Sequence, residues 1–271
     1  MKSIAIGFVA FVRCSSLLPL RAEWQHQVQL SGDPAGGRLT ISGLHGDLTI
    51  EGVDGSELTI SSPDIEAPEE PRQEASGEPN TGGLRSLLAG ASDNSGLGLQ
   101  VSVEGASVSI VAVRPRESAE FHLKIPRAMG LHVQGLLEGD VTVKNIQGDI
   151  EIAATNGDVE VQGATSPVVI HSVSGDVDLA FEAFPDTRPT SINAVDGDAQ
   201  VELPVDATVD LELRTLNGDI FTDLPVEVKD RRVVDWGGPK TVSAVLNGGG
   251  GKLAINAING DVIVRGPKSQ E

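Results

Sequence analysis

The sequence has few aromatic side chains: 271 residues include no tyrosine, six phenylalanines and two tryptophans. Aromatic residues contribute much of the apolar volume that fills a wide core between two sheets. Glycine, by contrast, is abundant at 32 residues. The core must therefore be built mainly from valine, isoleucine, leucine and alanine, which favours a narrow interior.

Cysteine is nearly absent as well, because Cys14 is the only one. A single thiol excludes an internal disulfide and a metal site built from several cysteines. Basic residues are also scarce: 20 lysines and arginines stand against 39 aspartates and glutamates, giving a formal net charge of −19. This charge would repel phosphate backbones, so we expect no nucleic-acid partner. It is compatible with cations or basic partners as ligands.

Residues 1–22 have the features of a secretory signal peptide. Lys2 supplies the positive start, an apolar run extends from Ile4 to Val12, and Ala22 is a small residue before the expected cleavage site. A buried N-terminal strand is the alternative, because Arg13 interrupts the apolar stretch. The prediction is an exported protein of the periplasm or cell surface. No later stretch approaches the ~20 apolar residues of a membrane helix, so we expect no membrane span.

The rest of the chain divides into three predicted parts by composition. Short alternating apolar and polar runs separated by glycine-containing turns predict N-terminal strands over 23–61. Prolines and acidic residues then dominate residues 62–97, which cannot bury enough apolar surface to offset the entropy of ordering. We predict a disordered acidic insertion there. Strand patterns resume at residue 98, and residues 98–271 form the predicted main repeat domain.

A Gly-Asp step followed by alternating aliphatic and polar residues recurs eight times, for example as NGDVEV at 156–161. From Gly139 onward the steps lie 9, 9, 18, 22, 21 and 42 residues apart. Nearly fixed spacing is typical of repeat architectures, in which each unit buries its apolar side on its neighbours. We therefore predict an all-β fold, a β-solenoid of stacked short strands. Its corners are predicted at Gly46, Gly139, Gly148, Gly157, Gly175, Gly197, Gly218 and Gly260.

The alternative fold is a β-sandwich of hairpins, because Asn217-Gly218 in TLNGDI is also a strong signal for a tight hairpin. In a hairpin, Leu216 would lie opposite Asp219 on one face. Most copies instead have aliphatic residues both two positions before and two positions after the glycine. This pattern predicts one bent strand, with both positions pointing inward and little room at the bend. The inward positions before the glycine are predicted to be Leu44, Leu137, Ile146, Thr155, Val173, Val195, Leu216 and Ile258.

Stacked corners would bring aspartates of neighbouring coils together, at about the 4.8 Å spacing of paired strands. Their mutual repulsion must be relieved. Each carboxylate could accept hydrogen bonds from backbone amides at its own corner, as aspartate commonly does in turns. Alternatively, divalent cations could bridge them, and Ca²⁺ is the cofactor that this arrangement would hold. The candidate metal ligands are Asp140, Asp149, Asp158, Asp176, Asp198, Asp219 and Asp261.

No sequence motif indicates catalysis. The five histidines have no short-range metal spacing, and LNGGGGK at 246–252 lacks the first glycine and the Ser or Thr of a phosphate-binding loop. SVSGDV at 172–177 lacks the Gly-x-Ser-x-Gly spacing of a nucleophile elbow. Carboxylates are so numerous that no pair stands out. We predict that the protein is not an enzyme.

The Gly-Asp repeats, KIPRAMGLHV at 124–133 and LNGGGGKLAINAINGDVIV at 246–264 resemble the bacterial "putative adhesin" domains of unknown function. The resemblance covers most of the chain outside the acidic insertion. It implies an exported, right-handed β-solenoid. The hypothesis is a non-enzymatic binding or scaffold protein of the cell envelope, whose partner is a protein or a glycan. The alternatives are a carbohydrate-active β-helix enzyme and a component of envelope stress signalling.

Overall fold

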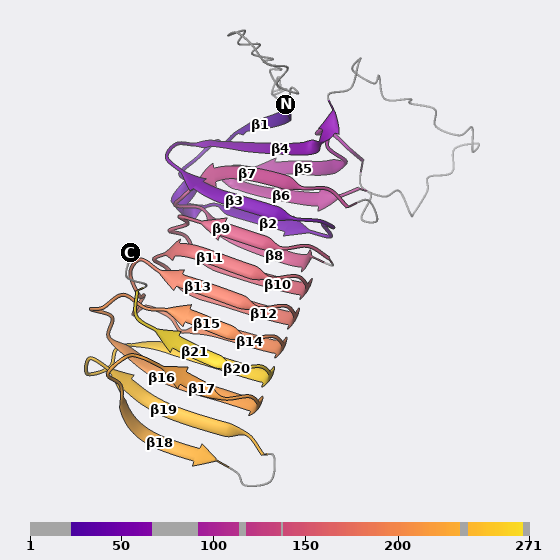
Figure 1. Cartoon of the computed structure of the whole chain (residues 1–271). Helices are drawn as coiled ribbons and strands as arrows, with labels where there is room; N and C mark the ends of the chain where they lie inside the picture. Colours follow the sequence, from indigo (N-terminus) through magenta and orange to yellow (C-terminus); the bar gives the residue numbers. More distant parts are fainter. Residues whose placement is uncertain (1–22, 67–91, 114–117, 137, 234–237, 268–271) are drawn as a thin grey trace, which may run out of the picture.

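The computed structural model describes residues 23–66, 92–113, 118–136, 138–233 and 238–267. Over these ranges the chain is an elongated stack of short strands with a single 3₁₀ turn, η1 (Pro34–Gly36), which confirms the predicted all-β solenoid (Figure 1). The predicted signal peptide and the central part of the predicted insertion, 67–91, lie outside the described residues.

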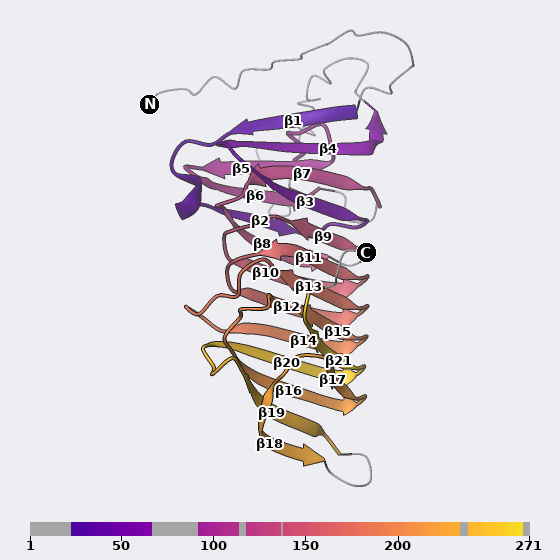
Figure 2. The ribbon, with the colours of Figure 1, turned by 60° about the vertical axis from the view of Figure 1, so that its left-hand side comes forward.

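Two sheets face each other along the length of the stack (Figures 1 and 2). Sheet A contains ten strands in the spatial order β1 (Glu23–Gln29), β4 (Glu57–Glu66), β7 (Phe121–Pro126), β3 (Leu48–Val53), β9 (Val141–Lys144), β11 (Val159–Ala164), β13 (Val177–Phe181), β15 (Ala199–Glu202), β21 (Val262–Arg265) and β17 (Ile220–Thr222). Sheet B contains eleven strands in the order β18 (Glu227–Val233), β19 (Lys240–Leu246), β16 (Val209–Asn217), β20 (Gly251–Asn259), β14 (Thr190–Asp196), β12 (Val168–Ser174), β10 (Ile150–Asn156), β8 (Gly130–Leu136), β2 (Arg38–Ser42), β6 (Ser107–Ala112) and β5 (Leu99–Glu104).

The repeating unit, which we call a rung, is one strand of sheet B followed by one strand of sheet A. β10 continues into β11 and β12 into β13, so consecutive rungs pair in parallel in both sheets. The register is regular, since Ile152 pairs with Ile170 in sheet B and Val159 with Val177 in sheet A. Equivalent residues of successive rungs therefore form columns along the stack.

The spatial order of the rungs departs from the chain order in two places. The β2–β3 rung lies between the β6–β7 and β8–β9 rungs, and the β20–β21 rung lies between the β14–β15 and β16–β17 rungs. Ile255 of β20, for example, pairs with Ile192 on one side and with Leu213 on the other. The sequence spacing did not predict these insertions.

Antiparallel strands cover the rungs at both ends of the stack. β4 and β1 extend sheet A beyond β7, and β5 extends sheet B beyond β6. At the other end, β19 and β18 extend sheet B beyond β16. Both flanks of the predicted insertion belong to the N-terminal end: β4 runs to Glu66, and the Asp93 carboxylate accepts backbone hydrogen bonds from Ser95 and Gly98 at 3.0 Å. Antiparallel end strands limit the unpaired parallel edges of such a stack.

The core consists of columns of small aliphatic side chains between the sheets. The residues two positions after the glycines fill it as predicted: Leu48, Val141, Ile150, Val159, Val177, Ala199 and Val262 are buried. Ile220, in the short strand β17, is only partly buried. The sequence prediction of a narrow aliphatic interior is confirmed.

The prediction for the residues two positions before the glycines is partly wrong. Leu44 and Ile146 are buried, and Thr155 is partly buried, whereas Leu137 lies outside the described residues. Four others point outward and are 36–50% exposed: Val173, Val195, Leu216 and Ile258. The last inward position of the strand lies one residue earlier and carries a small side chain, because little room remains beside the bend. These small buried residues are Ala154, Ser172, Ala194, Thr215 and Ala257.

Candidate functional site

The most regular surface feature of the stack is the corner at which the chain passes from sheet B to sheet A. Seven of the eight Gly-Asp steps lie there, one in each rung from β2–β3 to β16–β17. TLNGDI is therefore a corner between β16 and β17, not a hairpin. The eighth step, Gly148-Asp149, lies between β9 and β10 at the opposite turn, where the Asp149 carboxylate pairs with Arg188.

Close stacking of the rungs requires glycine at this corner. A Cβ atom added to Gly157 would lie 2.2 Å from the carbonyl oxygen of Gly139, and one added to Gly218 would lie 2.0 Å from that of Gly260. Gly157 also has a φ of 121°, in the region that favours glycine. The clash is with the backbone of the neighbouring rung, and not with the interior of the coil as the sequence pattern suggested. The same contact with a neighbouring backbone recurs at Gly46, Gly139, Gly175, Gly197 and Gly260.

The aspartates of these corners form a continuous ladder of hydrogen bonds. The backbone N–H of each aspartate donates to the Oδ1 of the aspartate in the preceding rung, as in Asp158 to Asp140 and Asp176 to Asp158, both at 2.8 Å. The six bonds are 2.7–3.0 Å long. We call this set the Asp ladder, which comprises Asp47, Asp140, Asp158, Asp176, Asp198, Asp261 and Asp219 in spatial order.

The ladder supplies a partner for carboxylates that would otherwise face like charges. At about 4.8 Å in water, two carboxylates repel each other by on the order of 1 kcal/mol. A hydrogen bond from a backbone N–H to a charged acceptor stabilises by about the same amount when exposed. The carboxylates accept backbone hydrogen bonds as predicted, but the predicted donor is wrong: the amide belongs to the corner of the neighbouring rung and not to the aspartate's own corner.

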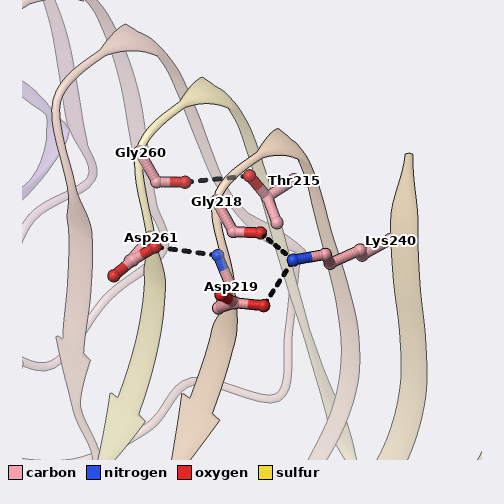
Figure 3. Close-up of polar contacts among 6 residues, drawn as sticks. All are labelled: Thr215, Gly218, Asp219, Lys240, Gly260 and Asp261. Atoms are coloured by element: carbon pink, nitrogen blue, oxygen red, sulfur yellow. Dashed lines mark hydrogen bonds and ion pairs between the residues drawn. The ribbon is translucent and has the colours of Figure 1, made fainter. Parts of the chain in front are cut away.

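The ladder ends at a lysine (Figure 3). The Nζ of Lys240, on β19, donates to the carbonyl oxygen of Gly218 at 2.6 Å and also contacts the Asp219 carboxylate. The Oγ1 of Thr215 donates to the carbonyl oxygen of Gly260 at 2.8 Å and ties the last two rungs together. The positive charge therefore lies at the last carboxylate of the column, which has no following aspartate.

Six of the seven candidate aspartates lie in the ladder, which also contains Asp47 and ends at Lys240, two residues that were not predicted. The step HGDLTI carries the same signal as the other copies, so Asp47 could have been included. Lys240 had no usable signal, because its place depends on the antiparallel β19. Asp149, which was among the candidates, lies outside the ladder.

The described residues contain no group of three or more histidine, cysteine, aspartate or glutamate side chains with the geometry of a metal site. In the ladder, one oxygen of each carboxylate is already engaged by a backbone N–H wherever a following rung exists. The calcium column remains a prediction from the sequence.

The outer faces of both sheets carry further polar columns. On sheet A, the column contains Thr142, Glu160, Asp178 and Gln200, and the Gln200 amide donates to the Asp178 carboxylate. On sheet B, the Asn256 amide donates to Asn193 Oδ1 at 3.2 Å, and Asn193 lies 3.4 Å from His171 Nδ1. These bonds join side chains of different rungs and restrict their motion. Parts of both outer faces thus carry polar side chains in register from rung to rung.

The sequence matches the model of the Toastrack DUF4097 family over residues 127–265. No curated protein matches it. Two solved structures match this chain with TM-scores below 0.5. A putative cell adhesion protein from Clostridium sporogenes has a TM-score of 0.47 and 11% identity, over 90% of this chain and 100% of that chain. A putative adhesin from Bacteroides fragilis has a TM-score of 0.40 and 12% identity, over 93% of this chain and 100% of that chain. In the described part of this chain, no helix has the length and hydrophobicity needed to cross a membrane.

Proposed function

Because the chain belongs to the Toastrack DUF4097 family, we propose that it is a non-enzymatic, adhesin-like binding or scaffold module, exported to the cell envelope. Its partner is a protein or a glycan of the envelope. Family membership accounts for the architecture, and the function is argued from the surface that this architecture presents.

The observation that carries the proposal is the register of the outward columns. Thr142 pairs with Glu160, Glu160 with Asp178, and Asp178 with Gln200, so polar groups repeat over four successive rungs, from β9 to β15. A partner with its own repeat or a flat polar surface can meet several such groups at once. The hydrogen bond from Gln200 to Asp178 already restricts two of these side chains, which lowers the entropy that binding must offset.

A carbohydrate-active enzyme is the competing function. Glycosidases place two carboxyl groups on either side of the scissile bond, about 5–9.5 Å apart, with different protonation states. The Asp ladder offers equivalent carboxylates instead: Asp140, Asp158 and Asp176 all accept the same backbone hydrogen bond from the next rung. A column of equivalent carboxylates is better suited to binding than to acid and base roles.

The proposal is tested by alanine substitutions in the sheet A column, at Glu160, Asp178 and Gln200. The purified chain is assayed for binding to envelopes of the bacterium that encodes it. Glu227→Ala, on the exposed end strand β18, is the control. We expect each column substitution to weaken binding partially, with the control unchanged.

Cell fractionation of the same strain measures export. A cytoplasmic protein, or envelope binding insensitive to all three column substitutions, would contradict the proposal. So would a hydrolytic activity on envelope glycans that disappears with one carboxylate and not with its neighbours.

A further inference from the structure

Four aliphatic side chains form an exposed column beside the Gly-Asp corner. Val173 is 50% exposed, Val195 36%, Ile258 43% and Leu216 38%. They lie in β12, β14, β20 and β16, which are adjacent strands of sheet B. Single apolar residues scattered over a surface are common, but four exposed aliphatic side chains in successive rungs form a contiguous patch that requires an explanation. We call these four residues the aliphatic column.

The strand register makes the column continuous. Ser172 pairs with Ala194 and Ser174 with Asp196, which places Val173 next to Val195. The flanking pairs of β20 in the same way place Ile258 between Val195 and Leu216. Ile258 comes from the rung that the chain adds last, so the column exists only in the folded stack.

Polar and acidic groups border the column on the side of the corner. The Asn217 amide donates to Asn259 Oδ1 at 2.8 Å, and the Asn259 amide donates to Asp196 Oδ1 at 2.5 Å. Beyond these residues lies the Asp ladder, with Asp176 and Asp198 exposed in the same rungs. An apolar stripe therefore runs parallel to a line of negative charge.

We propose that the aliphatic column and the Asp ladder together dock an amphipathic helix of a partner protein, with basic residues along one flank of its apolar stripe. This inference rests on the binding role proposed above and names a partner for a different surface, the corner instead of the sheet faces. The negative charge of the ladder selects lysine or arginine beside the apolar residues.

The spacing of the column favours a helix over an extended strand. Four rungs span three intervals of about 4.8 Å, roughly 14 Å in all. A helix that lies along the stack presents an apolar side chain at each turn of about 5.4 Å, roughly 16 Å over three turns. An extended strand presents one on the same face only every ~6.7 Å, roughly 20 Å over three intervals. The helical repeat is the closer match.

A second copy of the chain is a less favourable occupant. Two columns packed against each other would also bring two Asp ladders together, and the chain has a formal net charge of −19. Such like-charge contacts at an interface oppose association and suppress wrong partners. The negative charge of the ladder attracts a basic partner, whereas it repels a second copy of the chain.

The experiment measures fluorescence anisotropy of a labelled synthetic helix with the full chain. The peptide has leucine at i, i+4, i+7 and i+11 and lysine along one flank of that stripe. A peptide of the same composition with the leucines distributed around the helix, and one with glutamate in place of lysine, are the controls. We expect binding by the first peptide alone, weakening as salt is raised.

Two double variants separate the apolar and charged parts of the surface. Val195→Ser with Ile258→Ser should weaken binding about tenfold, the equivalent of two lost apolar contacts. Asp176→Asn with Asp198→Asn keeps the Oδ1 acceptors of the ladder and should reduce both the affinity and its salt dependence. Val205→Ser is the matched control, because Val205 is 79% exposed and lies outside the column. Thermal melts verify that each variant folds.

Equal binding of all three peptides, or equal weakening by Val205→Ser, overturns the proposal. Self-association of the chain that the Val195→Ser, Ile258→Ser variant abolishes also overturns it, in favour of a second copy as the occupant. Neither result bears on the proposed function, because that is measured by envelope binding of the sheet A variants. Loss of envelope binding in those variants, with no peptide binding here, would remove only the helix-docking inference.

Discussion

The backbone N–H of Asp261 donates to the Oδ1 of Asp198 at 2.7 Å, although 63 residues separate them. On its other side, Asp261 Oδ1 accepts from the N–H of Asp219, which precedes it by 42 residues. The last rung of the chain therefore completes an interior position of the stack. Until β20 and β21 are in place, the β16–β17 rung has no parallel neighbour in either sheet.

Gly157→Ala should destabilise the stack strongly. The new Cβ would lie 2.2 Å from the Gly139 carbonyl oxygen, and the φ of 121° is unfavourable for alanine. Gly55→Ala is the matched control, because Gly55 has a φ of 131° but no atom within 4 Å of its Cβ position. We expect about 1–3 kcal/mol of lost stability for Gly55→Ala and about 1–3 kcal/mol more for Gly157→Ala.

Chemical denaturation of both variants measures this difference. Equal losses for the two alanines would mean that backbone conformation alone, and not the close approach of the rungs, requires glycine at the corner.

Asp176 should tolerate asparagine but not alanine. Its Oδ1 accepts the backbone N–H of Asp198 at 2.8 Å, and the asparagine amide oxygen can take the same bond. Alanine leaves that N–H without its partner, for an expected loss of about 1 kcal/mol at this exposed site. Asparagine also removes one like charge from the column.

Thermal melts at low and high salt distinguish these effects. Salt should raise the melting midpoint of the wild type more than that of Asp176→Asn, because it screens the repulsion that asparagine has already reduced. A wild-type melting midpoint that falls as salt is raised would show that repulsion between the ladder carboxylates does not lower the stability of the fold.

Calcium should have little effect on stability. A ligand that binds only the folded state stabilises it in proportion to the logarithm of its excess over Kd. Since the ladder carboxylates already accept backbone hydrogen bonds, we expect midpoints in EDTA and in millimolar Ca²⁺ to agree within about 2 °C. A larger rise that Asp158→Asn abolishes would establish the calcium column instead.

The sequence was informative wherever structure depends on local pattern. The Gly-Asp step predicted both the corners and the inward residues that follow them, because a two-residue period continues through the strand after the bend. The outward turn of Val173 and Leu216 was not predictable in this way. The last inward side chain of each of these strands, such as Ser172 or Thr215, comes one residue before the aliphatic residue that the pattern placed inside. The exposed aliphatic residue next to it has the same sequence signal as a core residue.

The spatial order of the rungs could not be predicted from local sequence patterns. The nearly equal spacing of the steps suggested consecutive stacking, yet β20–β21 inserts between two earlier rungs. Only the match between whole strands, such as Ile255 with Ile192 and Leu213, selects that arrangement. Lys240 joins the candidate site for the same reason, since an antiparallel strand carries it to the end of the ladder.

Lys240→Met should loosen β17, the last strand of sheet A. The Nζ of Lys240 donates to Gly218 O at 2.6 Å and neutralises the terminal Asp219, and methionine keeps only the apolar stem. We expect faster amide hydrogen exchange in β17, with a loss of about 1 kcal/mol. Lys252→Met is the control, because Lys252 makes only a 3.5 Å contact with Glu212 at the surface. Unchanged exchange in β17 would mean that the lysine does not hold the rung.

Acidification should destabilise the N-terminal end of the stack through His26. Burial in β1 lowers the pKa of His26 below its usual 6.5, although the Asp93 carboxylate opposes the shift. The folded state therefore favours the neutral imidazole, and the unfolded chain binds a proton more readily. Its contribution to stability is fully present above pH 6.5 and is lost as the pH falls through the lowered pKa of the folded state.

His26→Gln should remove this part of the pH dependence. We expect the difference in melting midpoint between pH 7.5 and pH 5 to be smaller in His26→Gln than in the wild type. His171→Gln, on the outer face of sheet B, is the matched control and should keep the wild-type difference. If both variants behave alike, the acid sensitivity belongs to other groups, and the burial of His26 is not what couples the N-terminal end to pH.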